Sequence, residues 1–285
     1  MKLVLGTVQF GMTYGITNVS GPPTLNQVKS ILHQAQISGI DFLDTARSYG
    51  ESEVVLGESA AGNEWKIVSK LPAYIKPSEI SSTLNLSLQA LKRDSLYGLL
   101  LHRSEDFIET GGAKLFAELN NLKLSGIVKK IGFSVYNPEI LKRIIGDYTI
   151  DLVQLPLNVF GQSFLEDELL ERLKSKNIEV HVRSPFLQGI ALAEISRVPA
   201  LFSSEIEKLK DFENISQQLK VSKAALALNF LKKNPFVDKI VFGVDSLEQL
   251  RFNLDAYHTE IKFDDYTRFK FSNNKLANPS LWNVL

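Results

Sequence analysis

The chain has 285 residues with 32 basic and 32 acidic side chains, so its charge gives no argument for nucleic acid or a membrane as partner. It has no cysteine, which excludes disulfides and thiolate chemistry, and its four histidines lack metal-ligand spacing, so we expect no metal. The apolar start at 1–6 is too short for a signal peptide, and no apolar run reaches roughly 18 residues, so we expect a soluble cytoplasmic protein.

Short apolar runs alternate with longer amphipathic runs along the chain. The short runs predict strands, in chain order at 3–8, 40–44, 66–70, 96–102, 131–134, 151–155, 178–182 and 239–243. The longer runs predict helices at 25–37, 52–59, 78–92, 113–124, 138–145, 165–176, 205–219, 223–233 and 247–256. We expect one domain over 1–285, in which 257–285 forms a C-terminal tail or loop.

Eight strands, each followed by helix, predict an α/β fold of the (β/α)8 TIM-barrel type. The strand runs are continuously apolar, which is typical of parallel strands covered on both faces. An open, doubly wound sheet shows the same alternation. The count of eight strands, and the absence of Gly-x-Gly-x-x-Gly after the first, favour the closed barrel.

Two segments exceed ordinary loop length, at 9–23 and 184–202. Both follow strands, on the side where barrel active sites form. Thr24 and Ser222 stand immediately before expected helices, and their hydroxyls are typical N-caps.

Four polar residues follow three successive strands: Asp44 and Tyr49, then Lys70, then His102. Adjacent strand ends converge at one barrel mouth, so we expect them to lie together. A tyrosine has a pKa near ~10, and a nearby ammonium lowers it, while a histidine can orient a carbonyl oxygen. Taken singly, they could be a helix cap, a packed aromatic, a solvated rim charge and a core histidine. Their joint placement favours proton donation to a carbonyl.

The chain resembles the aldo-keto reductase superfamily over nearly its whole length. The matching segments are Leu5-Gly6-Thr7 with Phe10-Gly11, the stretch 39–50, Ser69-Lys70 and the run 99–102. The resemblance implies that Asp44, Tyr49, Lys70 and His102 form a catalytic tetrad. Tyr49 would be the general acid in reduction, Lys70 would tune it, Asp44 would pair with Lys70, and His102 would orient the substrate.

The resemblance also implies NADP(H) or NAD(H) as cofactor. The residues that match cofactor-binding positions are Gly6, Thr7, Ser134, Gln154, Arg183, Ser184, Phe186, Gln188, Gly189, Gly243, Ser246, Gln249 and Asn253. Three positions depart from the family pattern: Val135 replaces an asparagine, Arg183 an aromatic residue and Phe252 a glutamate. The family often stacks an aromatic ring on the nicotinamide, so a guanidinium replaces that stacking or the stacking is absent.

The adenosine-binding segment bears on the choice between the two cofactors. Many family members carry Lys or Arg here to hold a 2′-phosphate. This segment has Asp245 and Gln249 instead, with Arg251 the nearest cation. A carboxylate beside the ribose favours a 2′-hydroxyl, so we predict that NADH is used at least comparably with NADPH.

The substrate is less specified by the sequence. Phe10, Tyr14, Phe160 and Trp282 are candidate pocket residues, and each is equally well explained by ordinary packing. Arg47 and Arg103 flank the tetrad and could meet an anionic or sugar substrate. The chain's short form resembles family members of sugar biosynthesis, which implies a sugar-like aldehyde or ketone as the small-molecule partner.

Three function classes remain open. The first is the reductase, which the intact tetrad favours. The second is a nicotinamide-binding sensor or partner subunit with little turnover. The third is an unrelated barrel enzyme, either a metal-dependent hydrolase, for which ligands are missing, or a phosphate-sugar isomerase, for which no separate base and phosphate site is evident. The sequence leaves open whether the chain is a monomer or a small homo-oligomer.

Overall fold

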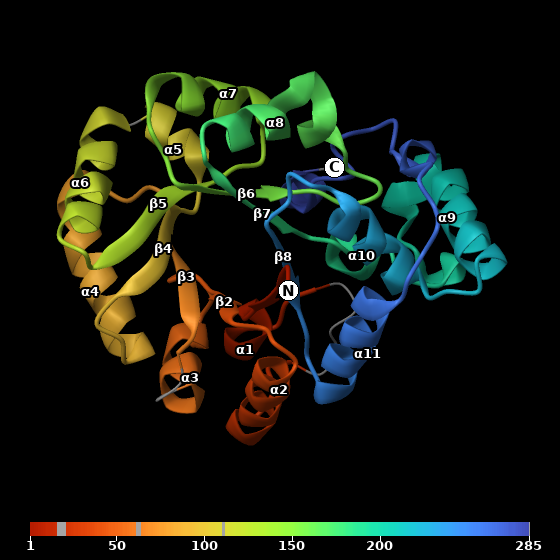
Figure 1. Cartoon of the computed structure of the whole chain (residues 1–285), viewed down its shortest axis with the longest axis horizontal. Helices are drawn as coiled ribbons and strands as arrows, with labels where there is room; N and C mark the ends of the chain where they lie inside the picture. Colours follow the sequence, from red (N-terminus) through yellow and green to blue (C-terminus); the bar gives the residue numbers. More distant parts are fainter. Residues whose placement is uncertain (16–20, 61–63, 110–111, 285) are drawn as a thin grey trace.

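The computed structural model describes residues 1–15, 21–60, 64–109 and 112–284. Eight parallel strands close into a barrel in sequence order, and helices lie around it (Figure 1). The strands are β1 Leu3–Gly6, β2 Phe42–Asp44, β3 Lys66–Leu71, β4 Leu96–Leu101, β5 Val128–Ser134, β6 Leu152–Pro156, β7 Glu179–Arg183 and β8 Lys239–Gly243. The predicted (β/α)8 fold is therefore confirmed.

The barrel interior holds its own apolar cluster, separate from the larger core between strands and helices. Six strands contribute one residue each to it, namely Val4, Phe42, Val68, Leu100, Leu152 and Val241. Side chains alternate across a strand, so the residue two positions later points to the same interior. That next layer lies toward the carboxyl ends of the strands.

The amino ends of the strands are closed by a polar and aromatic group. Glu179 accepts hydrogen bonds from Tyr97 at 2.7 Å and from Lys130, and its other oxygen lies 2.7 Å from His181 Nε2. Tyr97 packs edge-on against Phe42, with ring centroids 4.8 Å apart. Their position seals the end of the barrel opposite the predicted site.

The helices cover the outside of the barrel. The α-helices are α1 Val8–Gly11, α2 Leu25–Ile37, α3 Ser52–Ser59, α4 Ile80–Leu91, α5 Ser104–Glu109, α6 Gly112–Leu124, α7 Pro138–Asp147, α8 Leu169–Ser175, α9 Ile206–Gln218, α10 Lys223–Lys233 and α11 Leu247–His258. Thr24 caps α2 in a capping box with Gln27, and Ser222 caps α10, as predicted. In the described part of the chain, no helix combines the length and the apolar character that crossing a membrane requires.

Several boundaries differ from the sequence prediction. The first strand ends at Gly6 and is followed by the short helix α1, and α5 was not predicted. The helix expected over 165–176 is divided: a 3-10 segment, η2 Ser163–Glu168, precedes α8, because Asp167 and Glu168 take left-handed backbone angles. These are short or bent elements, for which a period of 3.6 residues gives little signal.

The tail after α11 packs on the loops at the carboxyl ends of β6 and β7. Phe271 stacks on Phe160 with centroids 4.7 Å apart, and its backbone nitrogen donates to the Phe160 carbonyl at 2.9 Å. Trp282 packs edge-on against Phe202, which belongs to the long segment 184–202. The other long segment, 9–23, is only partly described, because 16–20 lie outside the described residues.

Candidate active site

The predicted tetrad residues come together at the carboxyl ends of β2, β3 and β4. Asp44, Lys70 and His102 each stand two positions after a residue of the interior cluster, so all three face the barrel axis one layer above it. Lys70 Nζ donates to Asp44 Oδ1 at 2.6 Å and to the Thr45 carbonyl at 2.9 Å. Lys70 is 1% exposed and Asp44 3%, so they form a buried ion pair.

Tyr49 lies against this pair. Lys70 Nζ is 5.1 Å from the centre of the Tyr49 ring, and the His102 ring packs edge-on against Tyr49 with centroids 5.6 Å apart. The turn that carries Tyr49 is held tightly, because a Cβ on Gly11 would lie 2.0 Å from the Tyr49 carbonyl oxygen. A glycine at position 11 therefore lets the chain of α1 approach and fix this turn.

The protonation of Tyr49 differs from the sequence expectation. Burial, and then the Asp44 carboxylate, raise the pKa of Tyr49 well above its ordinary value, whereas Lys70 was expected to lower it. The reason is the ion pair: the Asp44 charge offsets the Lys70 charge, so the phenol meets a neutralised pair in a buried setting. Tyr49 is therefore protonated at neutral pH, which is the form that a proton donor requires.

His102 is held as a neutral imidazole. Burial, with the charges of Lys70 and Arg183, lowers the pKa of His102 to about 3. Its Nδ1 lies 3.0 Å from the Ser48 hydroxyl, which fixes the ring and leaves Nε2 as the nitrogen that can meet a carbonyl oxygen. At neutral pH the histidine can orient a substrate without adding a charge.

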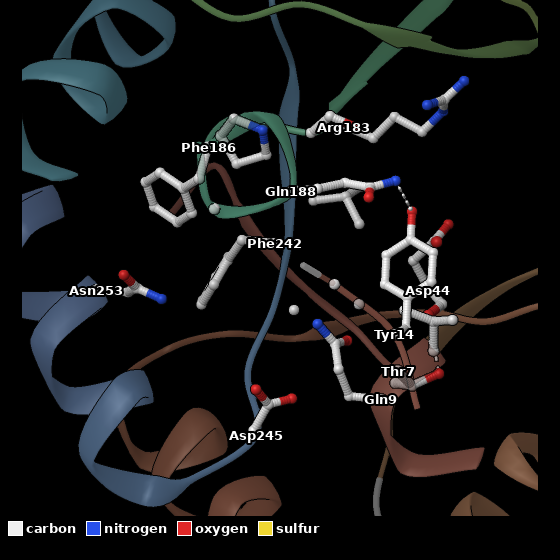
Figure 2. A pocket seen from close by; sticks show the side chains of 18 of the residues that line it. Thr7, Gln9, Tyr14, Asp44, Arg183, Phe186, Gln188, Phe242, Asp245 and Asn253 are labelled. Atoms are coloured by element: carbon white, nitrogen blue, oxygen red, sulfur yellow. Dashed lines mark hydrogen bonds between the residues drawn. The ribbon is translucent and has the colours of Figure 1, made fainter. Parts of the chain in front are cut away.

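A cavity of about 380 Å³ is lined by Asp44, Tyr49 and His102. Figure 2 shows it extending from Asp44 to Asn253. Most predicted cofactor positions line it, namely Gly6, Thr7, Gln154, Arg183, Ser184, Phe186, Gln188, Gly189, Gly243, Gln249 and Asn253. Ser134 and Ser246 do not line it. Ser134 is buried at the end of β5, and the Ser246 hydroxyl caps α11 by accepting from the Gln249 nitrogen.

The cavity floor offers an unsatisfied acceptor beside the tetrad. Gln154 is fully buried, and its amide nitrogen donates to Asp44 Oδ2 at 2.6 Å. That bond orients the amide and leaves Gln154 Oε1 buried without a hydrogen-bond partner. Buried polar atoms are normally paired, so this oxygen fits a ligand that donates, such as the carboxamide of a nicotinamide.

The opposite end of the cavity is suited to an adenosine. Figure 2 shows Phe186, Phe242 and Asn253 there, across the cavity from Asp44. Asp245 also lines this end, and burial raises the pKa of its carboxyl. Arg251, the nearest cation by sequence, does not line the cavity, and its guanidinium approaches Gln34 of α2 at 3.5 Å.

The cavity residues missed from the sequence include two with polar side chains, Gln9 and Tyr136. Gln9 follows β1, and its Oε1 is buried without a partner; a Cβ on Gly243 would lie 2.2 Å from it. Tyr136 lies two residues beyond β5, and its ring stacks on the Arg183 guanidinium, with Arg183 Cζ 3.8 Å from the ring centre. Both follow strand ends on the site's side, which is the signal that could have found them.

A second cavity, of about 810 Å³, joins the first at His102 and Tyr136. Its walls come from the loops after β2 to β6 and from the tail, including Arg103, Asn137, Ser163, Lys275, Asn278 and Ser280. Of the predicted pocket residues, Tyr14 lines the first cavity, whereas Phe10, Phe160 and Trp282 line neither and pack in or against the core. The tail therefore contributes to the mouth through residues other than its tryptophan.

The two arginines that flank the tetrad in sequence have different surroundings. Arg47 lines neither cavity and approaches the buried Glu53 carboxylate at 3.3 Å. Arg103 lines the second cavity and lies over the Tyr74 ring at 4.8 Å. Across residues 1–15, 21–60, 64–109 and 112–284, no His, Asp and Glu side chains cluster as a metal site would require.

Comparison with known proteins identifies the family. The family model described as "Aldo/keto reductase family" matches residues 2–273. The chain is 26% identical over 283 residues to "Uncharacterized oxidoreductase YqkF" of Bacillus subtilis (strain 168), and this match covers 90% of each chain. It is 25% identical over 315 residues to "NADH-specific methylglyoxal reductase" of Escherichia coli (strain K12), covering 93% of this chain and 96% of that protein.

The fold is also found among solved structures. The aldo-keto reductase AKR11C1 from Bacillus halodurans (holo form) matches with a TM-score of 0.78 and 15% sequence identity. The match covers 96% of this chain and 94% of that chain, and at this identity it shows the shared fold. Since the family model spans nearly the whole sequence, this chain belongs to the aldo/keto reductase family.

Proposed function

We propose that the protein is an NAD(P)H-dependent reductase that converts an aldehyde or ketone to an alcohol, with Tyr49 as the proton donor. The observation that carries this proposal is the buried Lys70–Asp44 pair, with Nζ to Oδ1 at 2.6 Å, beneath a phenol held in its protonated form. The family match and the two oxidoreductase relatives support the same reaction class.

The residues divide the work as follows. Reduced nicotinamide, when bound, supplies the hydride. Gln154 would hold the carboxamide through the oxygen that the Asp44 bond leaves open, and Phe186 and Asn253 would hold the adenosine end. Neutral His102 binds the carbonyl oxygen through Nε2, and Tyr49 transfers its proton to that oxygen as negative charge develops there. The Lys70–Asp44 ion pair lies against Tyr49 and supports the position of its ring.

We also propose that NADH serves at least as well as NADPH. Asp245 lines the adenosine end, and Arg251 is directed toward Gln34 rather than into the cavity. A carboxylate can accept a hydrogen bond from a ribose 2′-hydroxyl but repels a 2′-phosphate. Titration of each cofactor by fluorescence quenching tests this, and a tenfold or greater preference for NADPH would refute it.

The substrate we propose is polar and sugar-like. Six asparagine and serine side chains line the second cavity, namely Ser48, Asn137, Ser163, Asn274, Asn278 and Ser280. Such groups bind a polyhydroxylated carbonyl through hydrogen bonds, whereas a simple alkyl aldehyde leaves them unpaired. A panel of aldoses and short aldehydes, ranked by kcat/KM, tests this class.

The decisive experiment is the oxidation of NADH and NADPH, followed by absorbance, in wild type and in Tyr49→Phe. Loss of the phenol should lower kcat by roughly 10²–10⁴ while fluorescence quenching by cofactor persists. Thr267→Val provides a control, because the Thr267 hydroxyl is exposed and bonds only locally to Asp265 in the tail. Equal turnover in Tyr49→Phe and wild type would exclude Tyr49 as proton donor, and cofactor binding without any turnover would favour a sensor or partner subunit.

A further inference from the structure

The catalytic end of the first cavity holds one positive charge that its surroundings do not neutralise. Lys70 is paired with Asp44, and His102 is neutral at physiological pH. Arg183 remains. Within the described part of the chain no carboxylate forms an ion pair with it, and its Nη2 is buried without a hydrogen-bond partner. A buried donor of a charged group is costly to leave unpaired, so this nitrogen is suited to bind an acceptor, and the positive charge favours an anionic one.

Arg183 is held in place for such a role. Its backbone ends β7, and its guanidinium stacks on the Tyr136 ring at 3.8 Å. Stacking fixes the plane of the guanidinium while leaving its edge open to planar hydrogen-bonding partners. Figure 2 shows the side chain pointing away from Phe186 and Asn253, the adenosine end. The Arg183 guanidinium is therefore directed away from the loop 184–189, which follows Arg183 in the chain.

The field of Arg183 reaches the reacting groups. Burial has the largest influence on the pKa of Tyr49, Lys70 and His102, and the charge of Arg183 is a further influence on all three. Tyr136, on which Arg183 stacks, lines both cavities, at the junction where His102 also lies. A substrate that enters through the second cavity would thus meet Tyr136 and Arg183 as it reaches the tetrad.

We propose that Arg183, positioned by Tyr136, is a specificity-determining residue that binds a carboxylate on the substrate, so that the preferred substrates are oxo acids. This inference rests on the proposed reductase function and narrows its substrate class. The carboxylate pairs with the guanidinium edge through two parallel hydrogen bonds. The carbonyl group then lies between His102 and Tyr49, where the carbon accepts the hydride and the oxygen accepts the proton of Tyr49.

Arg103 and Lys275 in the walls of the second cavity agree with this substrate class. They outnumber the single acidic residue there, Glu105, so the approach to the junction is weakly positive. Like charges along an entrance raise the local concentration of an oppositely charged substrate. The amide and hydroxyl groups of the same walls are compatible with hydroxylated oxo acids.

The test compares carbonyl compounds that differ only in the carboxylate. The pairs are 4-oxobutanoate against butanal and 2-oxobutanoate against 2-butanone, assayed by NADH oxidation in wild type, Arg183→Met and Arg183→Lys. In wild type we expect at least one oxo acid to have a kcat/KM roughly 10- to 100-fold above that of its neutral partner, the range of a charge-assisted hydrogen bond. Arg183→Met should abolish this ratio, mainly through KM, and Arg183→Lys should restore part of it.

Controls separate the possible causes. Arg197→Met removes an exposed guanidinium that lines neither cavity and should leave the ratio unchanged. Tyr136→Ala should lower the ratio, because the guanidinium loses its support, whereas Tyr136→Phe should preserve it. Cofactor affinity is measured in every variant by fluorescence quenching.

Two results would overturn the inference while leaving the reductase intact. One is that wild type turns over the neutral carbonyl compounds and that neither oxo acid has a higher kcat/KM than its neutral partner. The other is that Arg183→Met loses cofactor affinity and that its kcat/KM falls by the same factor for the oxo acid and for its neutral partner. That result would assign Arg183 to the cofactor. If wild type reduces none of these carbonyls or the aldoses, the proposed function itself fails.

Discussion

Replacing Lys70 by methionine tests whether the buried ion pair is the structural base of the site. Lys70 and Asp44 are 1% and 3% exposed, and their charged atoms are 2.6 Å apart. Lys70→Met leaves the Asp44 carboxylate buried with Gln154 as its remaining side-chain donor. Breaking a buried pair from one side typically costs about 3–5 kcal/mol, so we expect the free energy of unfolding to fall by about that amount.

The double variant Asp44→Asn/Lys70→Met makes the argument quantitative. It removes both charges, and a neutral pair of similar volume is often no less stable than the ion pair it replaces. The double variant should therefore be more stable than Lys70→Met alone, giving a coupling energy of at least about 2 kcal/mol. Urea unfolding, followed by far-ultraviolet circular dichroism and by the fluorescence of Trp65 and Trp282, measures this when the two probes coincide. Strict additivity of the two single substitutions would refute the reasoning.

Other predictions concern the barrel bottom, the cavity and a cap. Burial opposes ionisation of Glu179, but hydrogen bonds from His181, Lys130 and Tyr97 hold its pKa below the usual value. Its contribution to stability is therefore present above about pH 4.5 and is lost progressively as the pH falls below that value. The stability difference between wild type and Glu179→Gln in urea should stay constant from about pH 7 to pH 5 and shrink from about pH 4.5 to pH 3. Gly243→Ala places a Cβ 2.2 Å from the flexible Gln9 amide, whereas Gly132→Ala places one 1.6 Å from the Leu152 carbonyl oxygen. The first should chiefly weaken cofactor binding in quenching titrations, and the second should lower the free energy of unfolding by about 1–3 kcal/mol; the reverse order would contradict the packing argument. Thr24→Ala should cost about 1 kcal/mol in urea unfolding, and no change would show that the capping box is unimportant.

The sequence was sufficient to predict the fold and the assembly of the tetrad. In a closed parallel barrel, each interior position is two residues from the next, and all strands end at one mouth. Asp44, Lys70 and His102 follow interior residues by that spacing, so their convergence is a property of the chain itself. Lengths of short or bent elements were less predictable, as η2 and α1 show, because they depend on local backbone angles rather than on a repeating apolar pattern.

Side-chain directions in loops could not be predicted in the same way. Phe160 and Trp282 were expected at a pocket, yet both pack against other aromatic rings, because an apolar ring gains more from burial than from lining a polar cavity. Tyr136 was missed although it stands close after β5, because its role arises from a contact with Arg183 on β7. Such a contact joins two non-adjacent strands, and no local pattern contains it.

The reversal of the expected Tyr49 pKa shift shows why proximity of charges is insufficient without their pairing. An isolated ammonium beside a phenol would stabilise the phenolate. Here the ammonium hydrogen-bonds to a carboxylate, so the pair acts on the phenol nearly as a dipole, and burial then favours the neutral phenol. The same burial keeps His102 uncharged. Among the residues that the structure describes at this end of the cavity, Arg183 carries a charge that no ion pair compensates. We therefore assign Arg183 to recognition of the substrate rather than to proton transfer.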